Sequence, residues 1–258
     1  MTLACVTGAS SGIGAEYARA LAERGYNLII TARRAEKLQA LADELQQAHG
    51  VSVRVITADL THEADLLRLV EVIEQETELD LLINNAGFGT TGDYATVEID
   101  RQIDMVRVHI EAPMRLCRAT LPNMIQRGKG YIINVSSIAA FLTTGSPTYT
   151  ATKAFLNNFS LSLQSEVKKT GIRIQALCPG YTYSEFHDTD EFSSFSRSQI
   201  PRWLWMTSEA VVKQSLEKLD RRRVILIPGF QNRLLVVLMR TGFLPLISWL
   251  RNRLVRER

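Results

Sequence analysis

The sequence contains few of the residues from which disulfide frameworks and metal sites are built. Its three cysteines, Cys5, Cys117 and Cys178, stand singly in apolar runs, and its four histidines are scattered. Neither set has the paired spacing of a disulfide framework or a zinc site. We therefore predict no metal site, and three buried thiols in a reducing compartment.

Strong charge and long apolar runs are also missing. The formal net charge of +3 is too small to indicate a nucleic-acid partner. A membrane span needs about 18 uninterrupted apolar residues, and the best candidate stretch, 234–250, is broken by Arg240, Gly242 and Pro245. Met1 leads directly into an apolar run, so we expect no signal or transit peptide and a cytoplasmic protein.

What is present is a regular alternation of short β-rich runs with amphipathic helical patterns. The chain has 258 residues, 46% of them hydrophobic, which suits one α/β domain. Strands that alternate with helices form a parallel sheet covered on both faces. We predict a doubly wound, seven-stranded, Rossmann-like sheet in a single domain, 1–258. The predicted strands are 3–7, 27–31, 51–57, 80–84, 130–136, 172–178 and 223–228.

Two segments depart from this alternation. Residues 181–206 form a long polar and aromatic loop, which we expect to be a substrate lid. Its aromatic content favours an apolar substrate, although the same side chains could simply pack the lid down. They are Phe186, Phe192, Phe195, Trp203 and Trp205, with Met206 beside them. Residues 229–258 form a C-terminal extension with an arginine-rich end. We favour pocket or subunit packing for it, with membrane association as the alternative.

A glycine-rich turn, TGASSGIG at 7–14, joins the first predicted strand to the first helix. Gly8 permits a tight turn, Gly12 lets a pyrophosphate approach the backbone, and Gly14 allows the helix to pack closely on the strand. The helix N-terminus supplies amide hydrogens and a positive dipole to phosphates. The cofactor contacts predicted in this turn also include Ser10, Ser11 and Ile13.

The spacing of these glycines resembles the TGxxxGxG signature of the short-chain dehydrogenases/reductases. Further motifs follow in register: NNAG at 84–87, YTATK at 149–153 and PG at 179–180, each after a predicted strand. The resemblance covers roughly 2–228. It implies a nicotinamide cofactor, a small-molecule carbonyl or alcohol substrate, and a homodimer or homotetramer. The further cofactor contacts it implies are Asp59, Leu60, Asn85, Ala86, Gly87, Pro179, Gly180, Thr182 and Ser184.

The end of the second predicted strand indicates which nicotinamide cofactor is used. A ribose 2′-hydroxyl is bound by an acidic residue at this point, whereas a 2′-phosphate is bound by arginine. The sequence TARRAEKL has no acid there and places Arg33 and Arg34 after Ala32. We therefore predict NADP(H), with Arg33 at the position that resembles the family's NADP-selecting one. The alternative is a solvated pair beside a helix.

The YTATK motif carries the predicted proton chemistry. Tyr149 and Lys153 are four residues apart, which places them on one face of a helix. The resemblance makes Tyr149 the proton donor or base and lets Lys153 hold the nicotinamide ribose. A nearby ammonium is expected to lower the phenol pKa. The serine that binds the substrate oxygen is Ser137 by the family pattern, whereas counting back from Tyr149 selects Ser136.

The sequence departs from the family at His109, where the family has an asparagine whose main-chain carbonyl holds a relay water. Four residues later, Pro113 has no N–H and should free the carbonyl of His109 inside a helix. We expect the imidazole, with an ordinary pKa of about 6.5, to order that water or to contact Lys153. The alternative is a packed His109 in a cofactor-binding protein with weakened or lost catalysis, acting by association.

Overall fold

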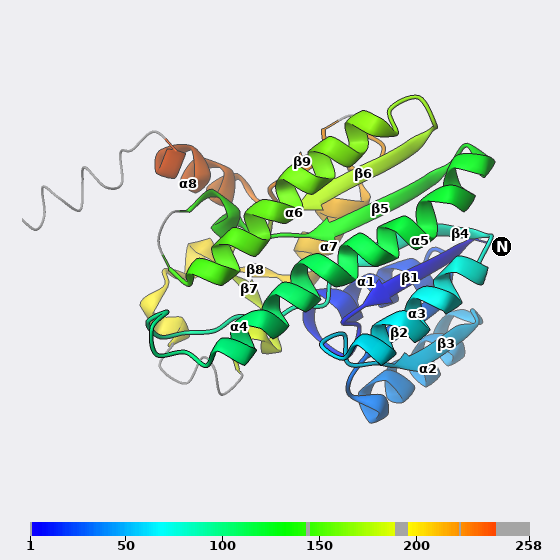
Figure 1. Cartoon of the computed structure of the whole chain (residues 1–258), viewed down its shortest axis with the longest axis horizontal. Helices are drawn as coiled ribbons and strands as arrows, with labels where there is room; N and C mark the ends of the chain where they lie inside the picture. Colours follow the sequence, from blue (N-terminus) through cyan, green and yellow to red (C-terminus); the bar gives the residue numbers. More distant parts are fainter. Residues whose placement is uncertain (1, 143–144, 189–195, 222, 241–258) are drawn as a thin grey trace, which may run out of the picture.

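The computed structural model describes residues 2–142, 145–188, 196–221 and 223–240. It confirms the predicted doubly wound sheet, whose seven parallel strands run in the order β3-β2-β1-β4-β5-β6-β9 (Figure 1). The strand order reverses between β1 and β4, which is where such sheets open a ligand crevice. The strands are β1 Leu3–Thr7, β2 Asn27–Ala32, β3 Val53–Thr57, β4 Leu79–Asn84, β5 Gly130–Val135, β6 Ile172–Leu177 and β9 Ile225–Leu226.

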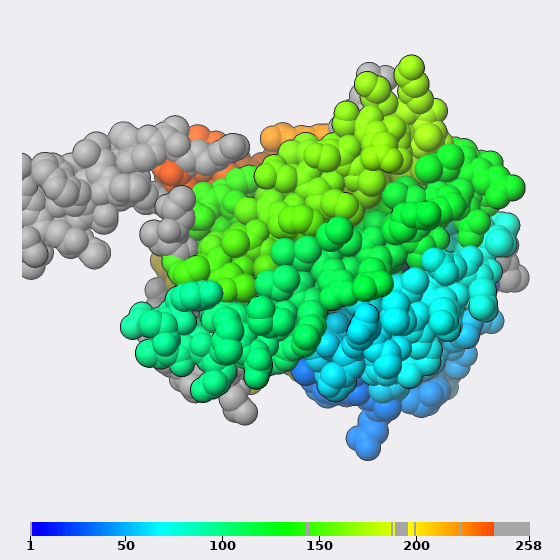
Figure 2. All heavy atoms as spheres, viewed as in Figure 1, coloured from blue at the N-terminus to red at the C-terminus, as the bar shows by residue number. Residues whose placement is uncertain are grey.

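Helices cover both faces of the sheet because successive strand residues point to opposite sides. Ala4 and Val6 of β1 pack with α1, α2 and α7, whereas Cys5 between them packs with α3, α5 and α6. The side chains of this second layer cover the sheet in the space-filling view (Figure 2). The helices are α1 Gly12–Ala22, α2 Ala35–His49, α3 Glu63–Gln75, α4 Ile99–Val106, α5 Ala112–Arg127, α6 Pro147–Glu166, α7 Ser208–Leu216 and α8 Phe230–Arg240.

The segment around His109 is a wide helical turn between two α-helices, rather than an α-helix with one missing bond. Residues Arg107–Glu111 form a π-turn, in which the N–H of Ala112 donates to the carbonyl of Arg107, five residues back. Pro113 is the second residue of α5, and because Glu111 and Ala112 have helical backbone angles, the helix runs continuously from the π-turn through the proline. The sequence correctly locates the irregularity, but the backbone accommodates the proline by widening one turn.

The described parts of the lid contain a small parallel ribbon. Strand β7 Thr182–Tyr183 pairs with β8 Met206–Thr207, and short 3₁₀ turns lie at Glu185–His187, Arg197–Gln199 and Arg202–Leu204. Trp205 is buried and stacks on Tyr183 at 4.8 Å between ring centres, so this aromatic packs the lid itself. Phe192 and Phe195 lie outside the described residues.

The C-terminal extension begins with α8, two of whose residues, Leu235 and Met239, line the main cavity. Residues 241–258 lie outside the described part, so the roles considered for the tail stay predictions. Among the residues that the structure describes, no helix is long and apolar enough to cross a membrane.

Gly14 provides a test of the packing at the first turn. A Cβ there would contact the carbonyl oxygen of Gly8 and Nδ2 of Asn85 at impossibly short distances. We expect Gly14→Ala to destabilise the protein by about 1–3 kcal/mol, seen as a lower Tm in a thermal melt. Helix propensity alone would instead favour alanine by about 1 kcal/mol. A raised Tm would therefore contradict the packing described here.

Candidate active site

A cavity of about 1060 Å³ opens at the carboxyl ends of the central strands, beneath the lid. Gly14 and His109 lie behind its wall. The other predicted site residues line it: Gly8, Ser10, Ser11, Gly12, Ile13, Arg33, Arg34, Asp59, Leu60, Asn85, Ala86, Gly87, Ser137, Tyr149, Lys153, Pro179, Gly180, Thr182 and Ser184. The fold thus brings residues from five separate motifs to one chamber, and their individual roles stay predictions.

The glycine-rich turn has the shape needed for a close backbone approach. Gly8 and Gly12 have φ angles of +68° and +56°, in the left-handed region that favours glycine. A Cβ on Gly8 would lie 2.8 Å from the Cα of Ala86, and one on Gly12 would lie 2.9 Å from the Cβ of Ser184. Helix α1 begins here with no side-chain cap from Ser11 and no acid in its first turn. Its first amide hydrogens are therefore available to an anionic ligand.

Asn85 holds the turns after β1 and β4 together. Its Nδ2 donates to the carbonyl oxygens of Thr7 at 2.9 Å and Gly8 at 3.2 Å. In return, the Thr7 hydroxyl oxygen accepts from the backbone N–H groups of Asn85 and Ala86, each at 3.0 Å. This reciprocal bonding fixes the floor of the cavity at the point where the strand order reverses.

The two arginines after β2 have different surroundings. Arg33 is 60% exposed, and its nearest carboxylate is that of Asp59, at 3.8 Å. Arg34 donates to the hydroxyls of Ser10 and Ser11, both at 2.8 Å, and also pairs with Glu185 of the lid at 2.7 Å. Arg33 is thus the more available cation at the cavity wall, whereas Arg34 is tied to the glycine-rich turn and to the lid.

The structure distinguishes the two candidate serines. The Ser137 side chain lies close enough to the phenol of Tyr149 to lower its pKa, and both residues line the cavity. Ser136 is buried, and its hydroxyl donates to the backbone carbonyl of Lys153 at 2.8 Å. Ser137 therefore has the geometry predicted for the hydroxyl that binds a substrate oxygen, and Ser136 anchors helix α6.

Burial governs the ionisation of the Tyr149 and Lys153 pair. Burial raises the pKa of Tyr149 to about 12, although Ser137 has the opposite effect on this pKa. Burial also lowers the pKa of Lys153 to about 7. Nζ of Lys153 donates to the carbonyl of Val135 at 2.9 Å and lies 5.6 Å from the centre of the Tyr149 ring. Burial, rather than the neighbouring Lys153, sets the phenol pKa in the protein alone. The phenol is protonated at neutral pH.

His109 is fully buried, and both of its ring nitrogens are engaged. Nε2 accepts from the N–H of Phe88 at 3.2 Å, and Nδ1 lies 2.9 Å from the hydroxyl of Thr152. That hydroxyl donates to the carbonyl of Tyr149 at 2.9 Å. Nδ1 must therefore carry the hydrogen, which fixes one neutral tautomer. Burial, with a smaller contribution from the charge of Lys153, holds the pKa of His109 well below its ordinary value.

This geometry corrects the expected behaviour of the His109 side chain. It does not titrate near pH 6.5, and its ring nitrogens bond Phe88 and Thr152 rather than Lys153. Gly87 makes room for the ring, because a Cβ there would lie 2.6 Å from Nε2. His109 instead joins the loop after β4 to the turn of α6 that carries Tyr149. The packed-residue alternative thus describes the contacts of this side chain.

Three residues at the site were not predicted. Thr7 is the first residue of the glycine-rich turn and Thr152 lies inside YTATK, so both could have been predicted from their places in those motifs. Glu185 gave no such signal, because its partners Arg34 and Lys37 are 151 and 148 positions away in the sequence.

The role of His109 can be tested with two replacements. Glutamine has an oxygen to accept from Phe88 and an N–H to donate to Thr152, whereas leucine has neither. We expect His109→Gln to keep most of the turnover, and His109→Leu to lose about tenfold to a hundredfold in kcat, because small misplacements of reacting groups are costly.

The same variants test the protonation state of the ring. Since His109 stays neutral, the pH–rate profiles of the wild type and His109→Gln should run parallel between pH 5.5 and 8. An ionisation in this range that is present in the wild type and absent from His109→Gln would contradict the assigned tautomer.

Sequence relatives lie within one family. Residues 2–192 match the model of the short chain dehydrogenases. An uncharacterized oxidoreductase of Myxococcus xanthus is 37% identical over 191 residues, which are 73% of this chain and 75% of that protein. The very-long-chain 3-oxoacyl-CoA reductase of Anas platyrhynchos is 36% identical over 183 residues, 69% of this chain and 59% of that longer protein.

Solved structures with the same fold match nearly the whole chain. A short-chain dehydrogenase from Sphingobium yanoikuyae in complex with NADPH has a TM-score of 0.84 and 30% identity, covering 100% of this chain and 96% of that one. The bulky-bulky ketone specific alcohol dehydrogenase from Comamonas testosteroni has a TM-score of 0.79 and 32% identity, covering 95% of this chain and 94% of that one.

Proposed function

The chain belongs to the short chain dehydrogenases, a family of oxidoreductases, and we propose that it interconverts a carbonyl group and a secondary alcohol on an apolar small molecule with NADP(H). The observation that carries this proposal is the meeting of Ser137 and Tyr149 in the same cavity as the glycine-rich turn. An association role without catalysis would not require this pair to be assembled beside a dinucleotide site.

The residues present fit a nicotinamide dinucleotide phosphate. Gly8 and Gly12 leave the space that a Cβ would fill, and the start of α1 offers amide hydrogens to the pyrophosphate. Arg33 is exposed at the cavity wall and suits a 2′-phosphate. The NADPH complex of the Sphingobium yanoikuyae relative supports the same choice. When bound, the nicotinamide supplies or accepts the hydride.

The protein's own side chains handle the oxygen and its proton. In the direction of reduction, the hydroxyl of Ser137 and the phenol of Tyr149 bind the carbonyl oxygen, and Tyr149 donates its proton as charge develops there. Its pKa of about 12 keeps that proton in place at neutral pH. The ammonium of Lys153 stabilises the phenolate that remains. In the direction of oxidation the phenolate accepts the proton.

The walls of the cavity around Tyr149 indicate the class of substrate. Phe186 of the lid lies 6.0 Å from the Tyr149 ring, centre to centre. The cavity lining also includes five aliphatic side chains and a methionine: Val108, Ile138, Leu142, Leu204, Leu235 and Met239. Such walls favour a bulky apolar ketone or its alcohol. The bulky-bulky ketone specific relative supports this proposal.

We also propose a homodimer or homotetramer in the cytoplasm, without a nucleic-acid partner. Helix α4 exposes Ile99, Ile103 and Val106 in one stripe, which is the kind of surface a second copy covers. Leu161 of α6 is exposed as well. All three cysteines are buried free thiols, which supports a reducing compartment.

Arg33 is expected to carry the cofactor preference. NADPH should bind at least about tenfold more tightly than NADH, because a phosphate–arginine pair contributes roughly 1.5–3 kcal/mol. Arg33→Ala should remove most of this difference, whereas Arg54→Ala, at an exposed arginine that pairs with Glu76, should not. Titration of both cofactors by fluorescence measures the ratio. Equal wild-type affinities would exclude the assignment to NADP(H).

The proton chemistry is tested by three variants. Tyr149→Phe should lower kcat by at least about a hundredfold while NADPH affinity changes little. Ser137→Ala should lower kcat by about a hundredfold through the loss of a hydrogen bond to the substrate oxygen. Ser136→Ala, the matched control, should mainly lower the Tm, because its hydroxyl donates to the backbone carbonyl of Lys153. If Ser136→Ala lowered kcat while Ser137→Ala lowered only the Tm, the placement of Ser137 at the substrate oxygen would be refuted.

A further inference from the structure

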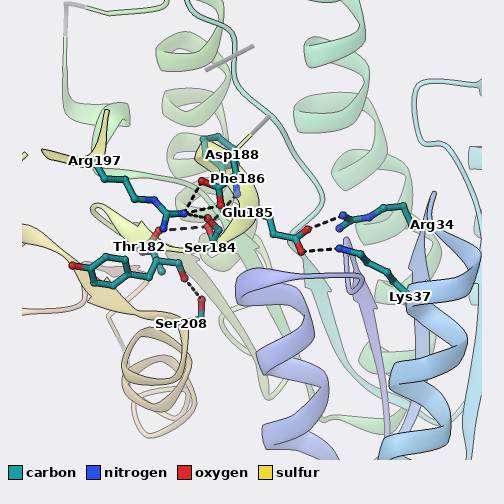
Figure 3. A network of polar contacts seen from close by, with 10 residues as sticks. Arg34, Lys37, Thr182, Ser184, Glu185, Phe186, Asp188, Arg197 and Ser208 are labelled. Carbon is teal, nitrogen blue, oxygen red and sulfur yellow. Dashed lines mark hydrogen bonds and ion pairs between the residues drawn. The ribbon is translucent and has the colours of Figure 1, made fainter. Parts of the chain in front are cut away.

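Glu185 of the lid is bound to two basic residues on the opposite side of the cavity mouth. Its carboxylate pairs with Nη1 of Arg34 at 2.7 Å and with Nζ of Lys37 at 2.7 Å (Figure 3). Arg34 lies just before α2 and Lys37 in its first turn, whereas Glu185 follows β7. These two cations lower the pKa of Glu185 to about 2, so its carboxylate is charged under all physiological conditions.

The short stretch around Glu185, Thr182–Asp188, crosses the cavity mouth, and we call it the strap. Thr182 and Ser184 line the cavity, and Ser184 packs against Gly12 of the glycine-rich turn. Phe186 lies against Tyr149 on the substrate side. Glu185 therefore lies between Ser184, which faces the cofactor site, and Phe186, which faces the substrate site.

The other described polar contacts of the strap lead to later residues of the chain. Arg197 donates to the carbonyl of Ser184 at 2.9 Å and to the carboxylate of Asp188 at 2.8 Å, and Ser208 donates to the carbonyl of Tyr183 at 3.1 Å (Figure 3). These bonds join the strap to later parts of the lid and to the start of α7. Among the described ion pairs, those of Glu185 with Arg34 and Lys37 connect the strap to the start of α2, on the opposite side of the cavity mouth.

We propose that Glu185 is a latch that holds the strap closed over the bound cofactor, so that its ion pairs with Arg34 and Lys37 slow cofactor release. This inference rests on the proposed function in one respect, that a nicotinamide dinucleotide occupies the cavity. Since the strap packs on Gly12, the pyrophosphate leaves the glycine-rich turn only when the strap moves. Opening the strap then requires both ion pairs to break.

Lys37 separates this effect from direct contact with the cofactor. Arg34 lines the cofactor cavity, but Lys37 lines a groove on the outer side of the strap, between α1, α2 and the lid. A change at Lys37 therefore tests the ion pair with Glu185 without altering a residue that lines the cofactor cavity. The side chains of the three residues are 45–47% exposed, so each pair alone is weak, and we expect a change of roughly threefold to tenfold in rate.

The test is the dissociation rate of NADPH, measured by stopped-flow fluorescence as excess NADP⁺ displaces it from the full-length protein. We expect Glu185→Gln and Lys37→Met each to release NADPH about threefold to tenfold faster than the wild type. The double variant should release it no faster than Glu185→Gln, because Lys37 acts through the same carboxylate. Glu209→Gln, an exposed carboxylate lining the same outer groove, is the matched control and should match the wild type.

Two results would overturn the latch in a protein that binds NADPH. One is that both single variants release NADPH at the wild-type rate. The other is that the double variant accelerates NADPH release by the full product of the two single accelerations. A wild type that binds neither NADPH nor NADH would instead refute the proposed function, and the latch with it. Because the assay needs no turnover, the two failures are distinguishable.

Discussion

The site depends on the close approach of the turn after β1 to the turn after β4. Gly8 and Ala86 lie so near one another that a single Cβ would collide, and Asn85 and Thr7 bond the two turns in both directions. This contact lies where the strand order reverses, so it forms the floor of the crevice. This contact positions three other parts of the site: the start of α1, the loop that contacts His109, and the strap over Gly12.

A second constraint is the burial of polar groups around Tyr149. Lys153 and His109 are both nearly inaccessible to water, and burial lowers the pKa of both, to about 7 for Lys153 and well below the ordinary value for His109. The cost is offset by hydrogen bonds to Val135, Phe88 and Thr152. The same hydrogen bonds hold Lys153 and His109 in one position. The two polar side chains whose burial costs free energy are therefore also fixed in place.

The sheet and the motifs could be predicted from the sequence because their causes are local. Alternating apolar runs define the strands, and Gly8 and Gly12 are needed for backbone angles that other residues avoid. The last strand is shorter than predicted, Ile225–Leu226 rather than 223–228, since only Ala176 and Leu177 of β6 pair with it.

Features that depend on distant partners could not be predicted. Pro113 signalled an irregular helix, but not that the irregularity would be a π-turn. The neutral state of His109 follows from its burial, and its tautomer from contacts with Phe88 and Thr152. Likewise, the YTATK spacing places Tyr149 near Lys153, yet the direction of their pKa shifts is decided by burial. The bond between Glu185 and Lys37 joins residues that are 148 positions apart.

We propose that one chamber holds both an NADP-type cofactor and an apolar carbonyl compound at Tyr149, close enough for hydride transfer. To test this proposal, NADPH that carries deuterium at the transferable C4 position is incubated with a bulky apolar ketone. We expect mass spectrometry to find the deuterium on the carbinol carbon of the alcohol. A protein that binds the labelled cofactor and transfers no deuterium to any of a panel of such ketones would contradict it.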